Sequence, residues 1–158
     1  MYSDLFDAYI YFRRNHFQIT ASIFLNNRNW AKYANLNGEF FEIKHYELDV
    51  YAVKSENKRE MIKIQQSNNS DRKRTDFKPC IIQNTNSSDN ICVSVKRLHI
   101  SSTTKYNKLV KNKPNEKQRY FNLVVELRVI STKGDSFILH AVESKNKIIS
   151  RVGFHILS

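Results

Sequence analysis

The sequence contains few of the residues that usually form turns, and it has no long apolar run. Its 158 residues include only three glycines and two prolines, so asparagine and serine must supply most of the turns. No stretch of about 18 apolar residues is present, which argues against a membrane-spanning helix. Asp4, Asp7, Arg13 and Arg14 interrupt the early apolar runs, so we expect no secretory signal there.

Common catalytic and metal-binding motifs are also missing. The sequence has no GxSxG, no HExxH, no glycine-rich phosphate loop and no CxxC. Its five histidines are scattered, and a lone histidine near a strand end is more often a hydrogen-bonded structural residue than a base. Cys80 and Cys92 are interpreted as reduced thiols buried in strands. We therefore expect no catalysis, no metal, no cofactor and no small-molecule substrate.

Positive charge is what the sequence has in excess. It contains 26 lysines and arginines against 15 acidic residues, a net charge of +11. A domain this basic usually binds a polyanion, either nucleic acid, anionic lipid or an acidic polysaccharide, although solubility alone is the simpler explanation. The length and the 41% hydrophobic content predict one domain over residues 1–158 with its own core. The abrupt ends suggest a domain excised from a larger protein.

Alternating apolar and polar residues predict a fold made of strands. The clearest case is residues 120–129, where Phe121, Leu123 and Val125 begin an apolar face and Asn122 and Glu126 lie on the opposite face. This pattern predicts a half-buried strand. Further strands are expected over residues 17–25, 61–64, 91–99 and 137–141, and residues 41–53 are rich in strand-forming residues. Residues 8–12 are a short apolar-aromatic run, and residues 79–82 an extended segment. Together they predict an antiparallel sandwich or barrel.

Several local features are expected between these strands. A bend or bulge should lie near His45, and Asn37-Gly38 and Gly134 should form turns. Polar turns or loops are expected at residues 26–29 and 84–90. Residues 30–36 should form a short helical turn or loop, and residues 105–110 a single helical turn after the capping residues 101–104.

Basic residues recur in five clusters near the expected strand ends. The clusters are Arg13-Arg14, Arg72-Lys73-Arg74, Lys96-Arg97, residues 111–119 and residues 145–151. Alternate loops of a sandwich gather at one end, so converging clusters would form one positive surface for a phosphate backbone. Arginine suits guanine edges in the major groove, whereas lysine more often contacts phosphate.

Five blocks of sequence occur in the same order as in one known family. They are RRNHFQIT (13–20), IQQS with SDRKR (64–67 and 70–74), RLHISSTT (97–104), KPNEKQRYF with LVV (113–121 and 123–125), and IISR (148–151). Together they resemble the DNA-binding domain shared by myelin regulatory factor-like proteins and the yeast meiotic mid-sporulation activator. The blocks span nearly the whole chain.

The resemblance implies an immunoglobulin-like antiparallel β-sandwich that contacts duplex DNA with loops at one end. It implies base contacts for Arg119, Lys147 and Arg151. Lys147 stands where the family has arginine, which keeps the charge without the two-pronged guanidinium. The further DNA-binding residues expected are Arg72, Lys73, Arg74, Gln66, Arg97, Lys111, Lys113 and Lys117. Gln66 either orders its loop or touches DNA, and the lysines near Arg119 are expected to face phosphates.

The resemblance also implies a larger parent protein. In that family a membrane-tethered precursor at the endoplasmic reticulum trimerises, cuts itself in a downstream domain and releases its N-terminal part to the nucleus. Trimerisation would use a region outside this chain. We therefore expect the sequence-specific DNA-binding domain of a nuclear transcription activator that regulates developmental or differentiation genes. The alternative is a basic β-sandwich that binds anionic lipid or another acidic partner.

Overall fold

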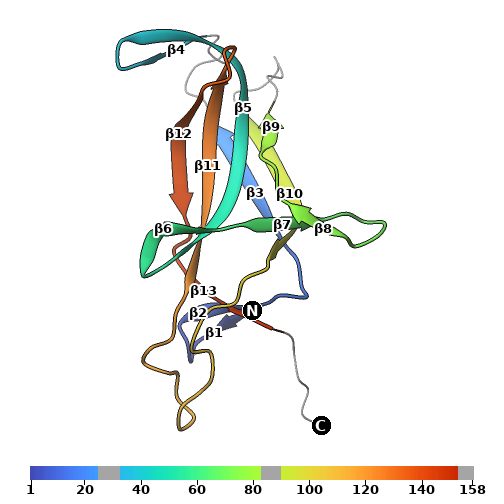
Figure 1. Ribbon diagram of the computed structural model, residues 1–158, viewed down its shortest axis with the longest axis vertical. Coiled ribbons are helices and arrows are strands. Elements are labelled where there is room, and N and C mark those ends of the chain that lie inside the picture. The colour runs from blue at the N-terminus through green and yellow to red at the C-terminus, as the bar shows by residue number, and fades with distance from the viewer. Residues whose placement is uncertain (25–32, 83–89, 153–158) are drawn as a thin grey trace.

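The computed structural model describes residues 1–24, 33–82 and 90–152, and these residues form strands and loops (Figure 1). The strands are β1 (Tyr2–Ser3), β2 (Ala8–Phe12), β3 (Phe17–Phe24), β4 (Tyr33–Leu36), β5 (Glu39–Lys54), β6 (Asn57–Ile62), β7 (Ile64–Ser67), β8 (Arg74–Asp76), β9 (Cys80–Ile82), β10 (Asn90–Ile100), β11 (Phe121–Ser131), β12 (Ser136–Glu143) and β13 (Lys147–Arg151). Within these ranges, no helix is long and apolar enough to cross a membrane.

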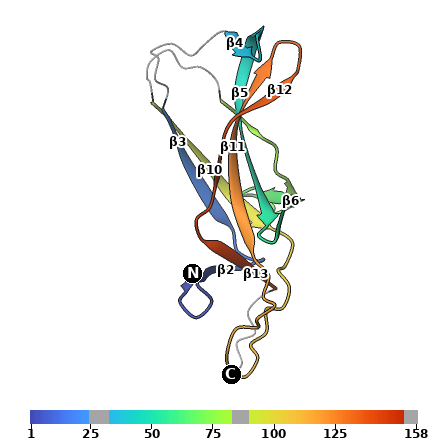
Figure 2. The same cartoon turned by 90° about the vertical axis from the view of Figure 1, so that its left-hand side faces the viewer.

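The strands form two sheets. The larger sheet has the order β1-β2-β13-β11-β5-β4, with β12 added to β11, and with β6 and β9 added to β5. The smaller sheet has the order β3-β10-β7-β8. Pairing is antiparallel except between β2 and β13, which run parallel. Figure 2 shows β3 and β10 in one layer and β5 and β11 in the other. The predicted all-β sandwich is therefore confirmed.

The strand β11 is the centre of the larger sheet. Its predicted apolar face lies in the main core, formed by Phe121, Leu123, Val125, Leu127 and Val129. The prediction of a half-buried strand is wrong, because Asn122 and Glu126 on the opposite face are only 6% and 4% exposed. Side chains from β5 and from the turn after it lie over that face, because Tyr51 donates a hydrogen bond to Glu126 and Ser55 donates one to Asn122.

Several predicted turns are present. Asn37 and Gly38 both have positive φ, 52° and 86°, and they join β4 to β5 in the conformation that two-residue hairpins favour. Gly134 has φ 92° in the turn between β11 and β12. The predicted bend near His45 is confirmed by a register shift between Ile130 and Ser131, the residues paired with that part of β5.

Other local predictions need correction. Residues 33–36 form β4 rather than a helical turn or loop, and residues 105–110 form an irregular loop without a helix. The single strand expected at residues 61–64 is divided between β6 and β7. Cys80 is half-buried, but Cys92 is exposed, so burial of both thiols was a wrong prediction. The turns expected at residues 26–29 and 84–89 lie outside the described residues.

A second, smaller core supports the parallel pair of β2 and β13. It contains Phe6, Ala8 and Ile149, with Ile10 and Tyr120 packed against it. The loop between β10 and β11 projects beyond this end of the molecule, away from β4 (Figures 1 and 2). The small core therefore holds the strand that carries Lys147 and Arg151 next to this long loop.

Candidate nucleic-acid interface

Strand β13 carries two of the predicted base-contacting residues at its ends. Its central residues Ile148, Ile149 and Ser150 are buried, which fixes the backbone of Lys147 and Arg151. Both terminal side chains lie over aromatic rings of the small core. The Arg151 guanidinium is 5.0 Å from the Phe6 ring centroid, and the Lys147 ammonium is 5.0 Å from that of Tyr120. Cation–π contacts of this kind orient the charged groups.

Arg151 is held more firmly than an ordinary surface arginine. Its Nη2 donates a hydrogen bond to the Asn107 carbonyl at 3.1 Å, whereas its Nε is buried without a partner among the described residues. Burial lowers the pKa of Arg151, but an arginine in a protein keeps its charge. The side chain is thus a half-buried cation with unused hydrogen-bonding capacity.

The loop at residues 101–120 is fastened to β13 by a buried polar network. The backbone N–H of Thr104 donates to the Ser150 carbonyl at 3.0 Å. The Asn107 side chain donates to the carbonyls of Thr104 and Ser150. Gln118, which is only 7% exposed, donates through Nε2 to Asn107 Oδ1 at 2.7 Å and to the Arg119 carbonyl at 2.8 Å. These side chains replace the intrahelical bonds of the helical turn that we expected.

Arg119 lies at the inner end of this loop with its side chain exposed. Its backbone N–H donates to the Lys105 carbonyl at 3.1 Å. Its guanidinium has no hydrogen bond or ion pair with any residue that the structure describes. With Lys105, Tyr106 and Ser102, it lines a cavity of about 420 Å³. Arg119 is therefore fixed at the backbone and unpaired at the side chain.

The lysines of this loop lie farther out. Lys111 and Lys113 belong to a small hairpin, in which the backbones of Val110 and Lys113 exchange two hydrogen bonds. Lys111 and Asn112 have φ 51° and 61°, as a tight two-residue turn requires. Lys117 is positioned by its backbone N–H, which donates to Asn115 Oδ1 at 2.9 Å. All three lysine side chains are exposed.

The second basic loop joins β7 to β8 and projects sideways in Figure 1. Arg72 has φ 55°, and Asp71 Oδ1 accepts a hydrogen bond from the Lys73 N–H at 2.8 Å. Arg72 and Lys73 are exposed, whereas Arg74 is partly buried. The Arg74 Nη2 donates to the Arg13 carbonyl at 2.7 Å. Arg74 thus connects this loop to the turn after β2.

Gln66 and Arg97 lie next to each other at the pairing of β7 with β10. Gln66 donates through Nε2 to the Lys96 carbonyl at 2.9 Å. Arg97 has φ 58° at a bulge, where the pairing of β10 with β3 shifts between Val95 and Leu98. The Gln66 side chain therefore helps to order the Lys96–Arg97 bulge. Bulges of this kind redirect side chains.

His99 fastens the turn after β2 to the smaller sheet. Its Nδ1 must donate to the Asn15 carbonyl at 2.8 Å, so Nε2 of the neutral ring accepts from the Ser67 hydroxyl at 2.8 Å. Burial, with Arg74 nearby, lowers the pKa of His99. This bonding makes His99 a structural residue, as expected for a lone histidine.

Hydrogen bonds link these separate basic segments into one line. Arg74 donates to the carbonyl of Arg13, and the Arg13 N–H donates to the carbonyl of Arg151 at 2.9 Å. Arg151 bonds to Asn107, Asn107 to Gln118, and Gln118 to Arg119. We call these residues the basic belt: Arg74, Arg13, Arg151, Asn107, Gln118 and Arg119. Lys147 lies at the other end of β13, and Lys73 and Lys117 directly precede belt residues.

Sequence reasoning missed three members of the belt. Arg13 was recognised as part of a basic cluster but not as a site residue. Asn107 and Gln118 gave no signal in the sequence, because polar residues in a basic loop are usually exposed. Gln118 is buried and Asn107 partly buried because the loop packs against β13.

Cations on the β5–β6–β11 side of the molecule have a different environment. Arg128 lies 2.9 Å from Asp49 and 2.8 Å from Glu126, and Lys58 lies 2.8 Å from Glu143. Tyr51 donates a hydrogen bond to Glu126, and burial together with this carboxylate raises the pKa of Tyr51 to about 12. These charges are satisfied within the chain.

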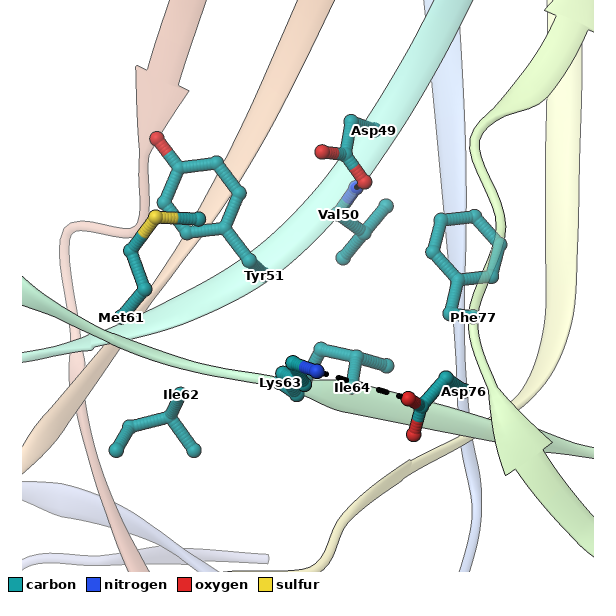
Figure 3. A pocket seen from close by; sticks show the side chains of 9 residues that line it. All are labelled: Asp49, Val50, Tyr51, Met61, Ile62, Lys63, Ile64, Asp76 and Phe77. Atoms are coloured by element: carbon teal, nitrogen blue, oxygen red, sulfur yellow. Dashed lines mark hydrogen bonds and ion pairs between the residues drawn. The ribbon is translucent and has the colours of Figure 1, made fainter.

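A pocket of about 220 Å³ opens on that side, next to Asp49 and Tyr51. Figure 3 shows Lys63 directed toward Asp76 at its lower wall, and the two groups are 3.7 Å apart. Carboxylates at this pocket would repel a phosphate backbone. The pocket is therefore not part of the candidate interface.

Comparison with known proteins adds independent information. The family model described as NDT80 / PhoG like DNA-binding family matches residues 8–151. The chain is 32% identical over 141 residues to myelin regulatory factor homolog 1 of Caenorhabditis elegans. The match covers 88% of this chain but only 15% of that protein. The matched family segment contains every belt residue.

Proposed function

Because the chain belongs to the NDT80/PhoG-like DNA-binding family, we propose that it is the sequence-specific, double-stranded-DNA-binding domain of a larger transcription factor. The observation that carries this proposal is the basic belt. Arg13, Arg151 and Arg119 are held by backbone or side-chain hydrogen bonds, and none of them has a carboxylate partner among the described residues. Fixed, unneutralised guanidinium groups suit the phosphates and guanine edges of duplex DNA.

We propose a division of labour within this surface. Arg151 and Arg119 are the base-contacting residues that we propose, with Lys147 beside them. The exposed lysines 73, 111, 113 and 117, together with Arg72 and Arg97, contact phosphates. Arg74 and Gln66 act mainly by holding neighbouring segments, since their side chains donate to the carbonyls of Arg13 and Lys96.

The finer features of the proposal concern the parent protein. We propose that it acts in the nucleus as an activator of developmental or differentiation genes, after release from a precursor tethered at the endoplasmic reticulum. It would form a homotrimer through a region outside this chain. Joining three such domains would raise affinity for clustered sites by multivalency, about 10²–10⁴-fold when the geometry permits simultaneous contact.

A binding experiment tests the central proposal. A duplex selected from a random pool by the chain is titrated against its scrambled version at several salt concentrations. We expect the chain to bind the selected duplex at least about 10³-fold more tightly than the scrambled duplex. Affinity should fall steeply as the salt concentration rises. Vesicles containing phosphatidylserine form a parallel arm. Equal affinity for all duplexes, with comparable binding to vesicles, would contradict the proposal and favour a general polyanion binder.

A further inference from the structure

Thr75 lies directly after three cations on the outermost strand of the smaller sheet. It follows Arg72, Lys73 and Arg74 in the sequence, and it is the middle residue of β8, which ends the order β3-β10-β7-β8. Its side chain is exposed, and its hydroxyl makes no hydrogen bond with residues 1–24, 33–82 and 90–152. This segment therefore presents a hydroxyl on an extended backbone that is paired with β7 alone among the described strands.

The cations before Thr75 form a pattern that protein kinases recognise. Arginine-directed serine/threonine kinases bind cations two and three residues before the hydroxyl with acidic groups in their substrate grooves. Only two hydroxyl residues in the sequence have an arginine three positions earlier. The first is Thr75, which follows Arg72. The second is Ser131, which follows Arg128, and it is only 1% exposed. The fold therefore leaves Thr75 as the accessible residue of the two.

Strand register places Thr75 near another pair of basic residues. Thr75 is paired with Gln66 in β7, and Gln66 is paired with Leu98 in β10, directly after the Lys96–Arg97 bulge. Gln66 Nε2 also donates to the Lys96 carbonyl at 2.9 Å. Residues directly opposite each other in an antiparallel pair have Cβ atoms about 4.5–5.5 Å apart. A charge added at Thr75 would therefore follow the cations of its own loop and face the bulge across the single strand β7.

We propose that Thr75 is a phosphorylation site of an arginine-directed serine/threonine kinase, and that its phosphate weakens DNA binding. The effect on DNA rests on the proposed function, whereas the modification itself does not. The kinase transfers the γ-phosphoryl group of ATP to Thr75 Oγ1. A bond forms between this oxygen and phosphorus, the bond from the γ-phosphorus to the bridging oxygen of ADP breaks, and the hydroxyl proton passes to the catalytic aspartate of the kinase.

A phosphate at Thr75 would reverse the charge of its loop. Residues 71–76 contain three cations and two carboxylates, a net charge of +1. A phosphothreonine adds about −1.5 to −2 at pH 7, which makes this segment negative. Its oxygens would accept charge-assisted hydrogen bonds from the side chains of Arg72 and Lys73. These cations would then be neutralised within the chain, and the remaining negative charge would repel a duplex.

The first experiment measures modification of the folded chain. The whole chain is incubated with ATP and each of several purified arginine-directed kinases, and the phosphate is located by mass spectrometry. We expect modification at Thr75, which Thr75→Val abolishes while keeping a β-branched residue in the strand. Arg72→Ala should slow the modification about tenfold or more. Arg59→Ala is the matched control, because it removes an exposed arginine from β6 and should leave the rate unchanged.

The second experiment compares the DNA affinity of the modified and unmodified chains. The selected duplex and its scrambled version are titrated over a salt series with both forms. We expect phosphorylation to lower affinity for both duplexes about tenfold or more at low salt, and to reduce the salt dependence by about two phosphate contacts. The ratio of the two affinities should be retained, because Arg72 and Lys73 are proposed phosphate contacts. Thr75→Val treated with kinase should bind like the unmodified chain, and thermal unfolding of each form identifies any loss of fold.

The outcomes separate this inference from the proposed function. If no kinase in the set modifies Thr75 in the folded chain, or if the phosphate appears at Ser131 instead, the inference is wrong. It is also wrong if the phosphorylated chain binds the selected duplex as tightly as the unmodified chain does. If the unmodified chain selects no sequence, the proposed function fails, while mass spectrometry still decides whether Thr75 is modified.

Discussion

Cations in two regions of this molecule have opposite environments. On the β5–β6–β11 side, Arg128, Lys54 and Lys58 each have a carboxylate within ion-pairing distance. In the basic belt, Arg13 and Arg119 have none among the described residues, and Arg151 is bonded only to a backbone carbonyl. The same residue types therefore serve two purposes. Paired cations are satisfied within the fold, whereas unpaired cations repel one another until an anion arrives.

The comparison separates stability from binding. Removing a paired cation leaves its carboxylates without a partner, so the folded chain should lose stability while its DNA affinity is retained. Removing an unpaired cation relieves repulsion and should affect mainly the complex. Variants from the two regions can therefore test whether this separation holds.

The largest effect is expected from Arg128→Ala. This change leaves Glu126 and Asp49 partly or fully buried without their guanidinium partner. We expect the free energy of unfolding at pH 7 to fall by roughly 2–3 kcal/mol, measured by urea unfolding. Selected and random duplexes should bind the folded variant as they bind the wild type. A change in DNA specificity would contradict the separation between cations that stabilise the fold and cations that bind DNA.

The pH dependence of Arg128→Ala has a defined sign. Burial already raises the pKa of Asp49, and Arg128 opposes that rise. Without Arg128 the folded-state pKa rises further above the unfolded value, so the charged carboxylate disfavours folding at neutral pH. The loss of stability should therefore shrink as the pH falls toward that pKa. Lys58→Ala is the control, because its exposed pair with Glu143 should contribute less than about 1 kcal/mol at any pH.

Arg119→Ala should weaken DNA binding, because Arg119 is the exposed residue of the basic belt. Its guanidinium has no partner in residues 1–24, 33–82 and 90–152, while its backbone is fixed through Lys105 and Gln118. Loss of a two-pronged base contact should weaken binding to the selected duplex by roughly 1–3 kcal/mol. The unfolding free energy should hardly change. An equal loss on random DNA, measured in the same titration, would make Arg119 a phosphate contact.

Much of the architecture could be predicted from local sequence patterns. The alternation that begins at Phe121 identified the core face of β11, and Asn37-Gly38 identified the turn of the β4–β5 hairpin. Such signals are local because strand period and turn conformation depend on a few neighbouring residues. Burial of Asn122 and Glu126 was not predictable in this way, since it depends on side chains from distant parts of the chain, Ser55 and Tyr51, that bond to them.

The belt depends on long-range contacts. Arg13 meets Arg151 only because β2 pairs in parallel with β13, two strands from opposite ends of the chain. Gln118 is buried only because Asn107 and the Lys105 carbonyl surround it. Sequence reasoning identified the charged residues, but the order in which hydrogen bonds connect them required the fold.

The smallest effect on DNA binding is expected from Lys73→Ala, which removes an exposed cation next to the basic belt. Lys73 is exposed, its backbone is held by Asp71, and its ammonium has no partner in the described part of the chain. Lys73→Ala should reduce the salt dependence of binding by about one phosphate contact, with specificity unchanged. Lys63→Ala is the matched control, because Lys63 is also exposed but lies near Asp76. The slope of log affinity against log salt concentration is measured for both variants. If the two slopes are identical, Lys73 does not contact a phosphate. If Lys73→Ala loses the preference at a base pair, Lys73 contacts a base instead.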